Sequence, residues 1–135
     1  MFVFLLPAAG MPGNLFALFG VGIVLMIAGI VLRWYAIRTL GRFFTFDVAV
    51  DQNHRVVDTG PYRYIRHPAY TGNLLTFVGL GLALGNWASL AVILILSLPG
   101  MAYRIRVEED ALATEIGQPY RDYMRRTRRL IPFLF

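Results

Sequence analysis

Charged side chains are missing from two long parts of the chain, and both parts predict membrane helices. The first uncharged part covers residues 2–32, and prolines and glycines interrupt only its beginning. The clean apolar stretch 15–32 has eighteen residues, which as a helix would measure about 27 Å, just enough to cross a bilayer core. Arg33, Trp34 and Tyr35 follow it with the basic and aromatic pattern of a membrane interface. The sequence therefore predicts a first transmembrane helix over about residues 14–33.

The second uncharged part runs over residues 69–103 and is too long for one crossing. Its 35 residues would form a helix of about 52 Å, well beyond the thickness of a bilayer core. Gly85-Asn86, near the middle, is a turn signal. We therefore expect two antiparallel transmembrane helices, over about residues 69–84 and 87–103.

Beyond residue 103 the chain becomes polar but keeps a helical pattern. Arg104 and Glu108 are four residues apart, a spacing that stabilises a helix as it leaves the membrane. Gly117 and Pro119 should end this helix, and a second short helix should follow. The predicted fold is all-α and integral to the membrane: three transmembrane helices and C-terminal cytoplasmic helices in one domain, residues 1–135.

Composition supports a membrane protein, and the charges orient it. The chain is 57% hydrophobic and 16% charged, with a mean hydropathy of +0.57, whereas soluble domains are roughly 25% charged. All 13 basic residues are arginines that flank apolar spans, so we expect anionic membrane lipids as partners and no nucleic acid. The arginines gather in segments 33–67 and 104–129, and the turn at residue 85 has no charge. The positive-inside rule therefore predicts an inner or plasma membrane protein whose active site faces the cytoplasm.

Several missing features narrow the function further. A signal peptide is the alternative for the first apolar stretch, but no basic segment precedes it. The sequence has no cysteine, which excludes disulfides, thiolate metal sites and cysteine nucleophiles. Its two histidines, His54 and His67, are far apart in the sequence and show no evident metal-ligand motif, so we expect no metal site.

Polar residues are concentrated at the mouth of the second uncharged part. Residues 59–72 read TGPYRYIRHPAYTG, with two arginines, one histidine and three tyrosines. Such groups are costly near a membrane unless something pairs with them. Antiparallel packing of the second and third helices would bring Glu108 and Glu109 to the same end, where opposite charges attract strongly. Tyrosine rings such as those of Tyr62 and Tyr70 offer faces for an adenine or a sulfonium.

Each of these groups also has a purely structural interpretation. Arg66 and His67 would then be a snorkelling pair at a helix end, and Glu108 and Glu109 a solvated helix face. The convergence of both pairs at one end of the helical hairpin favours a ligand site. The residues and their charges alone do not identify the reaction.

The order of the residues resembles the isoprenylcysteine carboxyl methyltransferase family, which is related to phospholipid N-methyltransferases. The resemblance covers about residues 56–132 and rests on a spaced set of motifs: Gly60-Pro61-Tyr62, Arg66-His67-Pro68, Tyr70, Gly72, Glu108-Glu109, Gly117, Tyr120, Tyr123 and Ile131-Pro132. It implies an integral membrane methyltransferase that uses S-adenosylmethionine, with a cofactor-binding core over residues 56–132. The residues that it implies for the cofactor pocket include Arg66, and those expected to bind the cofactor itself are His67, Pro68, Tyr70, Tyr62, Glu108 and Glu109.

The implied reaction moves a methyl group to a lipophilic acceptor, such as an isoprenylcysteine-like carboxylate. A carboxylate needs alignment, desolvation and a cation rather than a base, so Arg66 and Arg104 are the candidate catalytic residues. An amine acceptor, as in a phospholipid N-methyltransferase, would need His67 or a glutamate as base. Family members usually have more membrane helices before the motif, so we expect either a minimal core or a site completed by a second protomer of a homo-oligomer.

Two other classes of protein stay open. A membrane reductase of the sterol-reductase type has a similar C-terminal end, and the surplus arginines would suit the 2′-phosphate of NADPH. A non-catalytic assembly or regulatory subunit would bind neither cofactor. Binding of S-adenosylhomocysteine or of NADPH separates these classes from a methyltransferase.

Overall fold

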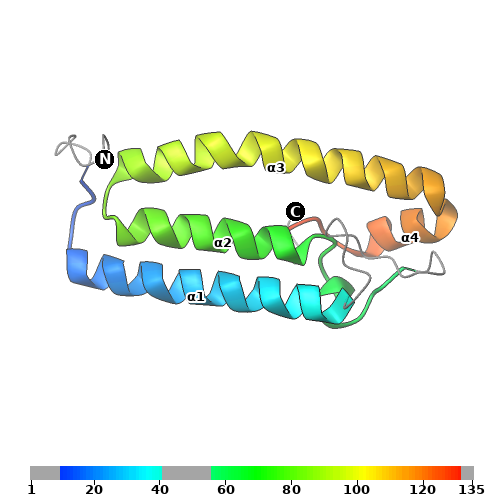
Figure 1. The fold of residues 1–135 in the computed structure, drawn as a ribbon, viewed down its shortest axis with the longest axis horizontal. Helices are drawn as coiled ribbons and strands as arrows, with labels where there is room; N and C mark the ends of the chain where they lie inside the picture. The colour runs from blue at the N-terminus through cyan, green and yellow to red at the C-terminus, as the bar shows by residue number, and fades with distance from the viewer. Residues whose placement is uncertain (1–9, 41–55, 132–135) are drawn as a thin grey trace.

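The computed structural model describes residues 10–40 and 56–131, and within these ranges it is helical and contains no extended strand. The elements, in chain order, are α1 (Leu15–Leu40), the 3-10 helix η4 (Gly60–Arg63), α2 (Pro68–Ala83), α3 (Trp87–Glu115) and α4 (Gln118–Arg126). The three long helices run lengthwise, with α2 packed between α1 and α3 (Figure 1). The short α4 folds back at the far end of α3. The all-α prediction is confirmed for the described residues.

A tight turn joins α2 to α3 where the sequence predicted it. Gly85 has a φ of +64°, a conformation that glycine adopts without steric cost. The Oδ1 atom of Asn86 accepts hydrogen bonds from the backbone N–H groups of Ala88 and Ser89, at 2.9 and 3.3 Å, and so caps α3. The turn makes α2 and α3 antiparallel, so the end of α3 returns toward the beginning of α2.

Glycines allow α1 and α2 to approach each other closely. Gly22 and Gly29 are two helical turns apart on α1, and Gly72 and Gly79 have the same spacing on α2. A Cβ atom on any of the four would collide with backbone atoms of the opposite helix. Small residues that let two backbones meet in this way are typical of helix pairs in membranes.

The prediction of three transmembrane helices is wrong in number, because only two described helices are long and apolar enough to cross a membrane alone. These are α1 and α3. The α2 helix has 16 residues, about 24 Å, which falls short of the bilayer core. Both candidate spans present apolar side chains outward: Phe16 is 85% exposed and Leu96 is 76% exposed.

The helix ends also differ from those predicted. The α1 helix continues to Leu40 rather than ending near residue 33, because its basic and aromatic interface residues do not interrupt the helix. The α3 helix continues past residue 103 to Glu115, through Pro99 inside it. This agrees with the predicted extension beyond the apolar part. Both extensions project toward the same end of the molecule.

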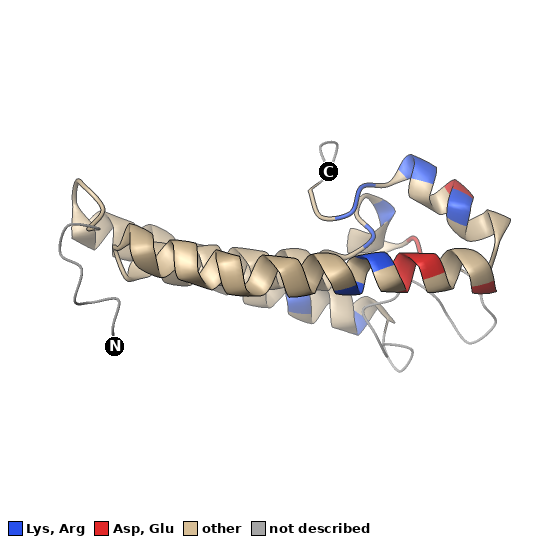
Figure 2. Cartoon of the chain, turned by 90° about the horizontal axis from the view of Figure 1, so that it is seen from above, with Lys and Arg blue, Asp and Glu red and all other residues tan. Residues whose placement is uncertain are grey.

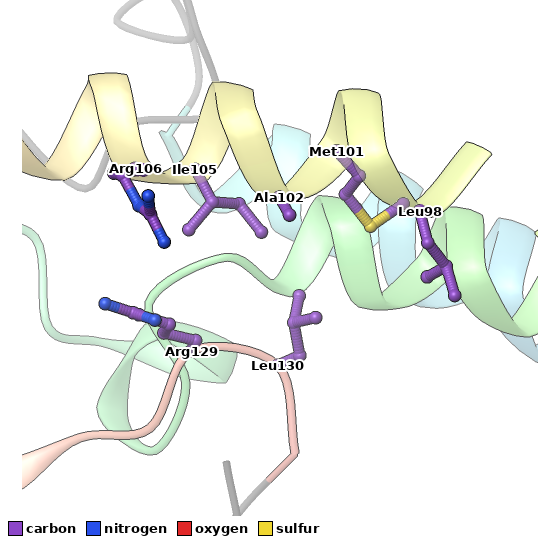
Figure 3. Close-up of a pocket in the computed structure, with 7 residues that line it drawn as sticks. All are labelled: Leu98, Met101, Ala102, Ile105, Arg106, Arg129 and Leu130. Atoms are coloured by element: carbon purple, nitrogen blue, oxygen red, sulfur yellow. The ribbon is translucent and has the colours of Figure 1, made fainter. Parts of the chain in front are cut away.

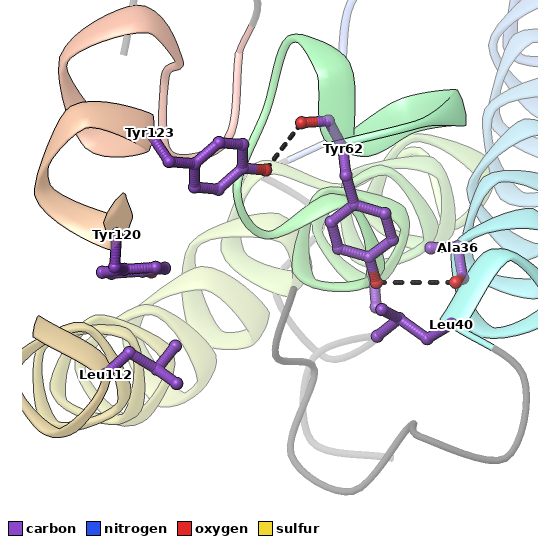
Figure 4. Close-up of a cluster of buried hydrophobic side chains, with 7 residues drawn as sticks. Ala36, Leu40, Tyr62, Leu112, Tyr120 and Tyr123 are labelled. Atoms are coloured by element: carbon purple, nitrogen blue, oxygen red, sulfur yellow. Dashed lines mark hydrogen bonds between the residues drawn. The ribbon is translucent and has the colours of Figure 1, made fainter. Parts of the chain in front are cut away.

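A cluster of buried side chains closes this end of the bundle (Figure 4). It includes Leu40 of α1, Tyr62 of η4, Leu112 of α3, and Tyr120 and Tyr123 of α4. The hydroxyl of Tyr123 donates a hydrogen bond of 2.6 Å to the backbone carbonyl of Tyr62. Burial raises the pKa of Tyr120 and of Tyr123 well above the usual value for tyrosine, so both phenols stay neutral. The cluster fixes α4 and η4 against the ends of the long helices.

Candidate functional site

Charged residues of the described chain gather at one end of the bundle, and the opposite end has none (Figure 2). At the charged end, α3 has left its apolar part and the chain before α2 meets the segment after α4. The backbone N–H of Arg66 donates to the carbonyl of Arg128 at 2.7 Å, and that of His67 donates to the carbonyl of Arg129 at 3.0 Å. The N–H of Arg128 donates to Tyr64 at 3.0 Å. The motif before α2 is therefore held by the C-terminal segment, residues 127–131.

Glu109 lies at the centre of the charged cluster and is 4% exposed. Its Oε1 atom accepts from Arg66 Nε at 2.8 Å and lies 3.0 Å from His67 Nε2. Its Oε2 atom accepts from Arg129 Nε at 3.1 Å. Because an ionised carboxylate can only accept hydrogen bonds, Nε2 of His67 is the donor in that contact. Three donors thus compensate the charge of this buried glutamate.

Arg66 is also buried inside the protein, with 8% of its surface exposed. Besides the contact to Glu109, its Nη1 atom donates to the carbonyls of Met124 and Thr127, at 2.8 and 2.9 Å. A snorkelling side chain would place its guanidinium in water or among headgroups, whereas this one ties α3 to the end of α4. Its predicted role in orienting an acceptor stays a prediction.

Glu108 has a different environment from its neighbour Glu109. Tyr70 donates its hydroxyl to Glu108 Oε1 at 2.9 Å. The second oxygen lies 4.0 Å from His67 Nδ1, too far for a hydrogen bond. That nitrogen is buried and makes no hydrogen bond within the described part of the chain. Arg104 packs over the ring of Tyr70, with its Cζ 5.7 Å from the ring centroid.

Two hollows border the cluster from different sides of α3. The first, of about 430 Å³, is lined by Tyr103, Arg104, Val107, Glu108, Ala111, Leu112 and Glu115. The second, of about 260 Å³, lies between α3 and the C-terminal segment and is lined by Leu98, Met101, Ala102, Ile105, Arg106, Arg129 and Leu130 (Figure 3). Glu108 therefore borders an open hollow, whereas Glu109 faces protein donors.

The structure brings most of the predicted site residues together. Its cluster contains Arg66, His67, Tyr70, Glu108 and Glu109. The binding and catalytic roles assigned to these residues stay predictions.

Three other predicted residues lie around the cluster or apart from it. Pro68 is buried at the first position of α2, and Arg104 stands at the edge of the cluster. Tyr62 lies apart, in the tyrosine cluster. Its predicted contact with a cofactor is not tested by this position.

Other motif residues have outcomes of different kinds. Gly72 closely approaches the backbone of α1, and Pro132 lies outside the described residues. Arg129 was not among the predicted site residues and belongs to a basic run at residues 125–129. Its distance of 20 residues from Glu109 gave no local signal of a pairing.

Comparison with known proteins gives a consistent result. Residues 22–114 match the sequence profile of the isoprenylcysteine carboxyl methyltransferase family. The chain is 33% identical over 116 residues to a probable protein-S-isoprenylcysteine O-methyltransferase of Oryza sativa subsp. indica, covering 84% of this chain and 61% of the relative. It is 34% identical over 115 residues to protein-S-isoprenylcysteine O-methyltransferase B of Arabidopsis thaliana, covering 84% and 58%.

A fungal relative gives a similar value. The protein-S-isoprenylcysteine O-methyltransferase of Saccharomyces cerevisiae is 33% identical over 115 residues, covering 84% of this chain and 48% of the relative. The chain therefore spans about half to three fifths of the length of these curated relatives.

Proposed function

Since the chain belongs to the isoprenylcysteine carboxyl methyltransferase family, we propose that it transfers a methyl group from S-adenosylmethionine to a carboxylate on a lipophilic acceptor. The reaction takes place at the charged end of the bundle. The relatives are named as isoprenylcysteine O-methyltransferases, which favours an oxygen acceptor over the amine of a phospholipid. The names of the relatives also favour a methyl donor over NADPH as the cofactor.

The observation that carries the proposal is the difference between Glu108 and Glu109. Glu109 already compensates Arg66, Arg129 and the donor nitrogen of His67. Glu108 borders a hollow with aromatic and aliphatic walls and is steadied by the Tyr70 hydroxyl. A carboxylate in a partly desolvated hollow suits a sulfonium cation, and the ring of Tyr103 in the same hollow adds a π face. Glu108 would therefore stabilise the bound S-adenosylmethionine. Glu109 would stabilise the fold of the site through its contacts with protein donors.

The proposed reaction needs no proton transfer. An acceptor carboxylate oxygen forms the new bond to the methyl carbon while the carbon–sulfur bond breaks and its electrons stay on sulfur, so a methyl ester and a neutral thioether result. The residues of the chain have to orient the acceptor, remove its hydration shell and balance its charge. His67 has no need to act as a base here, which agrees with the engagement of its Nε2 atom with Glu109.

The bundle would stand in the membrane with its charged end in the cytoplasm. The arginines at this end and the uncharged turn at the other support this orientation. The α2 helix, too short to cross alone, would be carried within the bilayer by its close packing on α1. A lipophilic or prenylated acceptor would then reach the site laterally from the lipid phase.

Binding measurements on the detergent-solubilised protein test the proposal. We expect binding of S-adenosylmethionine and S-adenosylhomocysteine but not of NADPH, and transfer of labelled methyl to N-acetyl-S-farnesylcysteine but not to phosphatidylethanolamine. NADPH binding would support the reductase, and binding of neither cofactor would support a non-catalytic subunit. Transfer to the phospholipid would move the assignment to the N-methyltransferases.

Glu108→Gln tests the role of this glutamate in particular. We expect the affinity for S-adenosylmethionine to fall by about 1–3 kcal/mol, or roughly five- to 150-fold. The affinity for S-adenosylhomocysteine should fall less, because its sulfur is neutral. Asp110→Asn, which removes the same charge from an exposed position on the same helix, is the matched control. If the Glu108→Gln variant and the wild type have equal affinities, Glu108 does not contact the cofactor and only forms part of the helix surface.

A further inference from the structure

A third, smaller hollow at the charged end of the bundle is lined mainly by arginines. Its volume is about 170 Å³, and its lining residues are Tyr64, Arg125, Arg126 and Arg128. None of these four residues is acidic, and none lines either of the two hollows beside α3. Three guanidinium groups around one small hollow repel one another unless an anion lies between them. The composition of this arginine pocket therefore suits an anionic ligand.

The acidic side chains around the arginine pocket compensate its charge only in part. Asp58 accepts from Arg126 Nη2 at 3.2 Å, and Asp122 lies 3.9 Å from Arg125 Nη1. All four of these side chains are about half exposed or more, and exposed pairs of this kind attract each other weakly. Arg128 forms no ion pair within the part of the chain that the structure describes. The pocket therefore keeps a net positive charge.

Contacts from two distant segments position the walls of the arginine pocket. Arg126, the last residue of α4, packs over the ring of Tyr123, with its Cζ 5.7 Å from the ring centroid. The backbone N–H of Arg128 donates to the carbonyl of Tyr64 at 3.0 Å. The pocket thus spans the junction between the end of α4 and the chain before α2. Because these walls are already held by the fold, a ligand would have little ordering cost to overcome.

We propose that the arginine pocket binds the phosphate group of an anionic phospholipid. Guanidinium groups bind phosphate oxygens through pairs of N–H donors. A volume of about 170 Å³ is below the roughly 300–1,000 Å³ of sites that enclose a whole small molecule. The pocket therefore suits a headgroup whose acyl chains stay outside it. This lipid site is distinct from the site of methyl transfer, and its occupation requires no methyl transfer.

The position of the arginine pocket along the chain favours a lipid over a soluble phosphate. Tyr64 is four residues before Pro68, the first residue of α2, and residues 69–103 carry no charge. On the other wall, Arg128 is two residues before the apolar sequence LIPFLF at residues 130–135. Both walls are thus within a few residues of apolar chain. Arginine and tyrosine at such a boundary are typical of the headgroup region of a membrane.

A bound phosphate would also reinforce the backbone pairing that holds the arginine-histidine motif. The carbonyl of Arg128 accepts from the N–H of Arg66, and the N–H of Arg128 donates to Tyr64. A phosphate that binds the guanidinium of Arg128 would restrain this residue in the paired position. Because a ligand that binds only the folded state stabilises it, we expect an anionic lipid to raise the Tm of the protein.

Lipid titration of the detergent-solubilised protein tests the assignment. The probes are dioleoyl phosphatidylglycerol, dioleoyl phosphatidylcholine, which has no net charge, and glycerol 3-phosphate, which is soluble. We expect phosphatidylglycerol to raise the Tm and to bind at least about tenfold more tightly than either other probe. Equal binding of the two lipids would overturn the assignment. Binding of glycerol 3-phosphate as tightly as phosphatidylglycerol would assign the pocket to a soluble phosphate and would overturn the lipid assignment.

Matched arginine variants distinguish the pocket from a general attraction of the basic end. Arg128→Gln and Arg125→Gln should each lower the affinity for phosphatidylglycerol at least about tenfold, because each removes charge-assisted hydrogen bonds. Arg121→Gln is the control: Arg121 is exposed, one helical turn before Arg125, and outside the pocket. It contributes a similar long-range field, so its variant should keep the wild-type affinity within about threefold. Equal losses in all three variants would overturn the assignment, whether or not the protein transfers methyl groups.

Discussion

Replacing Glu109 by glutamine should destabilise the folded protein more than it weakens cofactor binding. The substitution keeps the shape of the side chain but removes the negative charge that compensates Arg66, His67 and Arg129. Removing one partner from a buried ion pair costs about 3–5 kcal/mol, because the other charges stay buried. The amide oxygen of glutamine can still accept hydrogen bonds from Arg66 and His67, so we expect a loss at the lower end, about 3 kcal/mol. For a chain of this length that corresponds to a lowering of Tm by about 10 °C.

Thermal unfolding in detergent, followed by intrinsic fluorescence, measures this effect. Asp110→Asn is again the control, since it removes a carboxylate from an exposed position next to Glu109. If Glu109→Gln fails to fold, Arg129→Gln offers a milder test. It removes one of the three contacts, from a side chain that is 41% exposed, and should cost about 1 kcal/mol or less. A Tm for Glu109→Gln equal to that of Asp110→Asn would refute the idea that this glutamate holds the site together.

Three further predictions concern the bundle. Gly29→Ala should lower the free energy of unfolding by about 1–3 kcal/mol in thermal unfolding, because its Cβ would meet the backbone of α2. Gly20→Ala, where a Cβ meets nothing, should be neutral. Equal Tm values for the two variants would contradict the close packing of α1 and α2. Tyr123→Phe should cost about 1–2 kcal/mol through its lost 2.6 Å hydrogen bond, whereas Tyr103→Phe, at a side chain 71% exposed, should change little; similar losses in both would exclude a special role for the buried hydroxyl. Reporters fused after Asn86 and after the C-terminus should lie on opposite sides of the membrane, and the same side for both would exclude a crossing by α3.

The helical hairpin and the meeting of its charged ends could be predicted from local sequence. Gly85 and Asn86 determine the turn through a positive φ and a capping side chain, and both properties belong to the residues themselves. Because the turn makes the helices antiparallel, the arginine-histidine pair before α2 and the paired glutamates in the second half of α3 come to the same end of the hairpin. The length of α2 was also predicted well. The prediction that a helix of this length crosses the bilayer alone was wrong.

The division of roles inside the cluster could not be predicted from the sequence. Adjacent residues on a helix point about 100° apart, so one of two neighbouring glutamates must face the protein more than the other. Which of them does so depends on how α3 is rotated against the C-terminal segment. The position of Arg129 depends on the same packing, since it meets Glu109 only after α4 has folded back. These are tertiary relations, and no local spacing encodes them.

The hydrogen bonds of Arg66 to the C-terminal segment have a consequence for biosynthesis. Thr127, which accepts from Arg66, is 61 residues further along the chain. At about 5–20 residues per second, a ribosome needs roughly 3 to 12 seconds to make the intervening chain. During this interval Arg66 lacks its final partners. Glu109, which it contacts in the folded protein, is not made until most of the interval has passed. The charged cluster is therefore completed last, after the apolar helices have been made, and a nascent chain interrupted before residue 127 would lack the Thr127 carbonyl that accepts from Arg66.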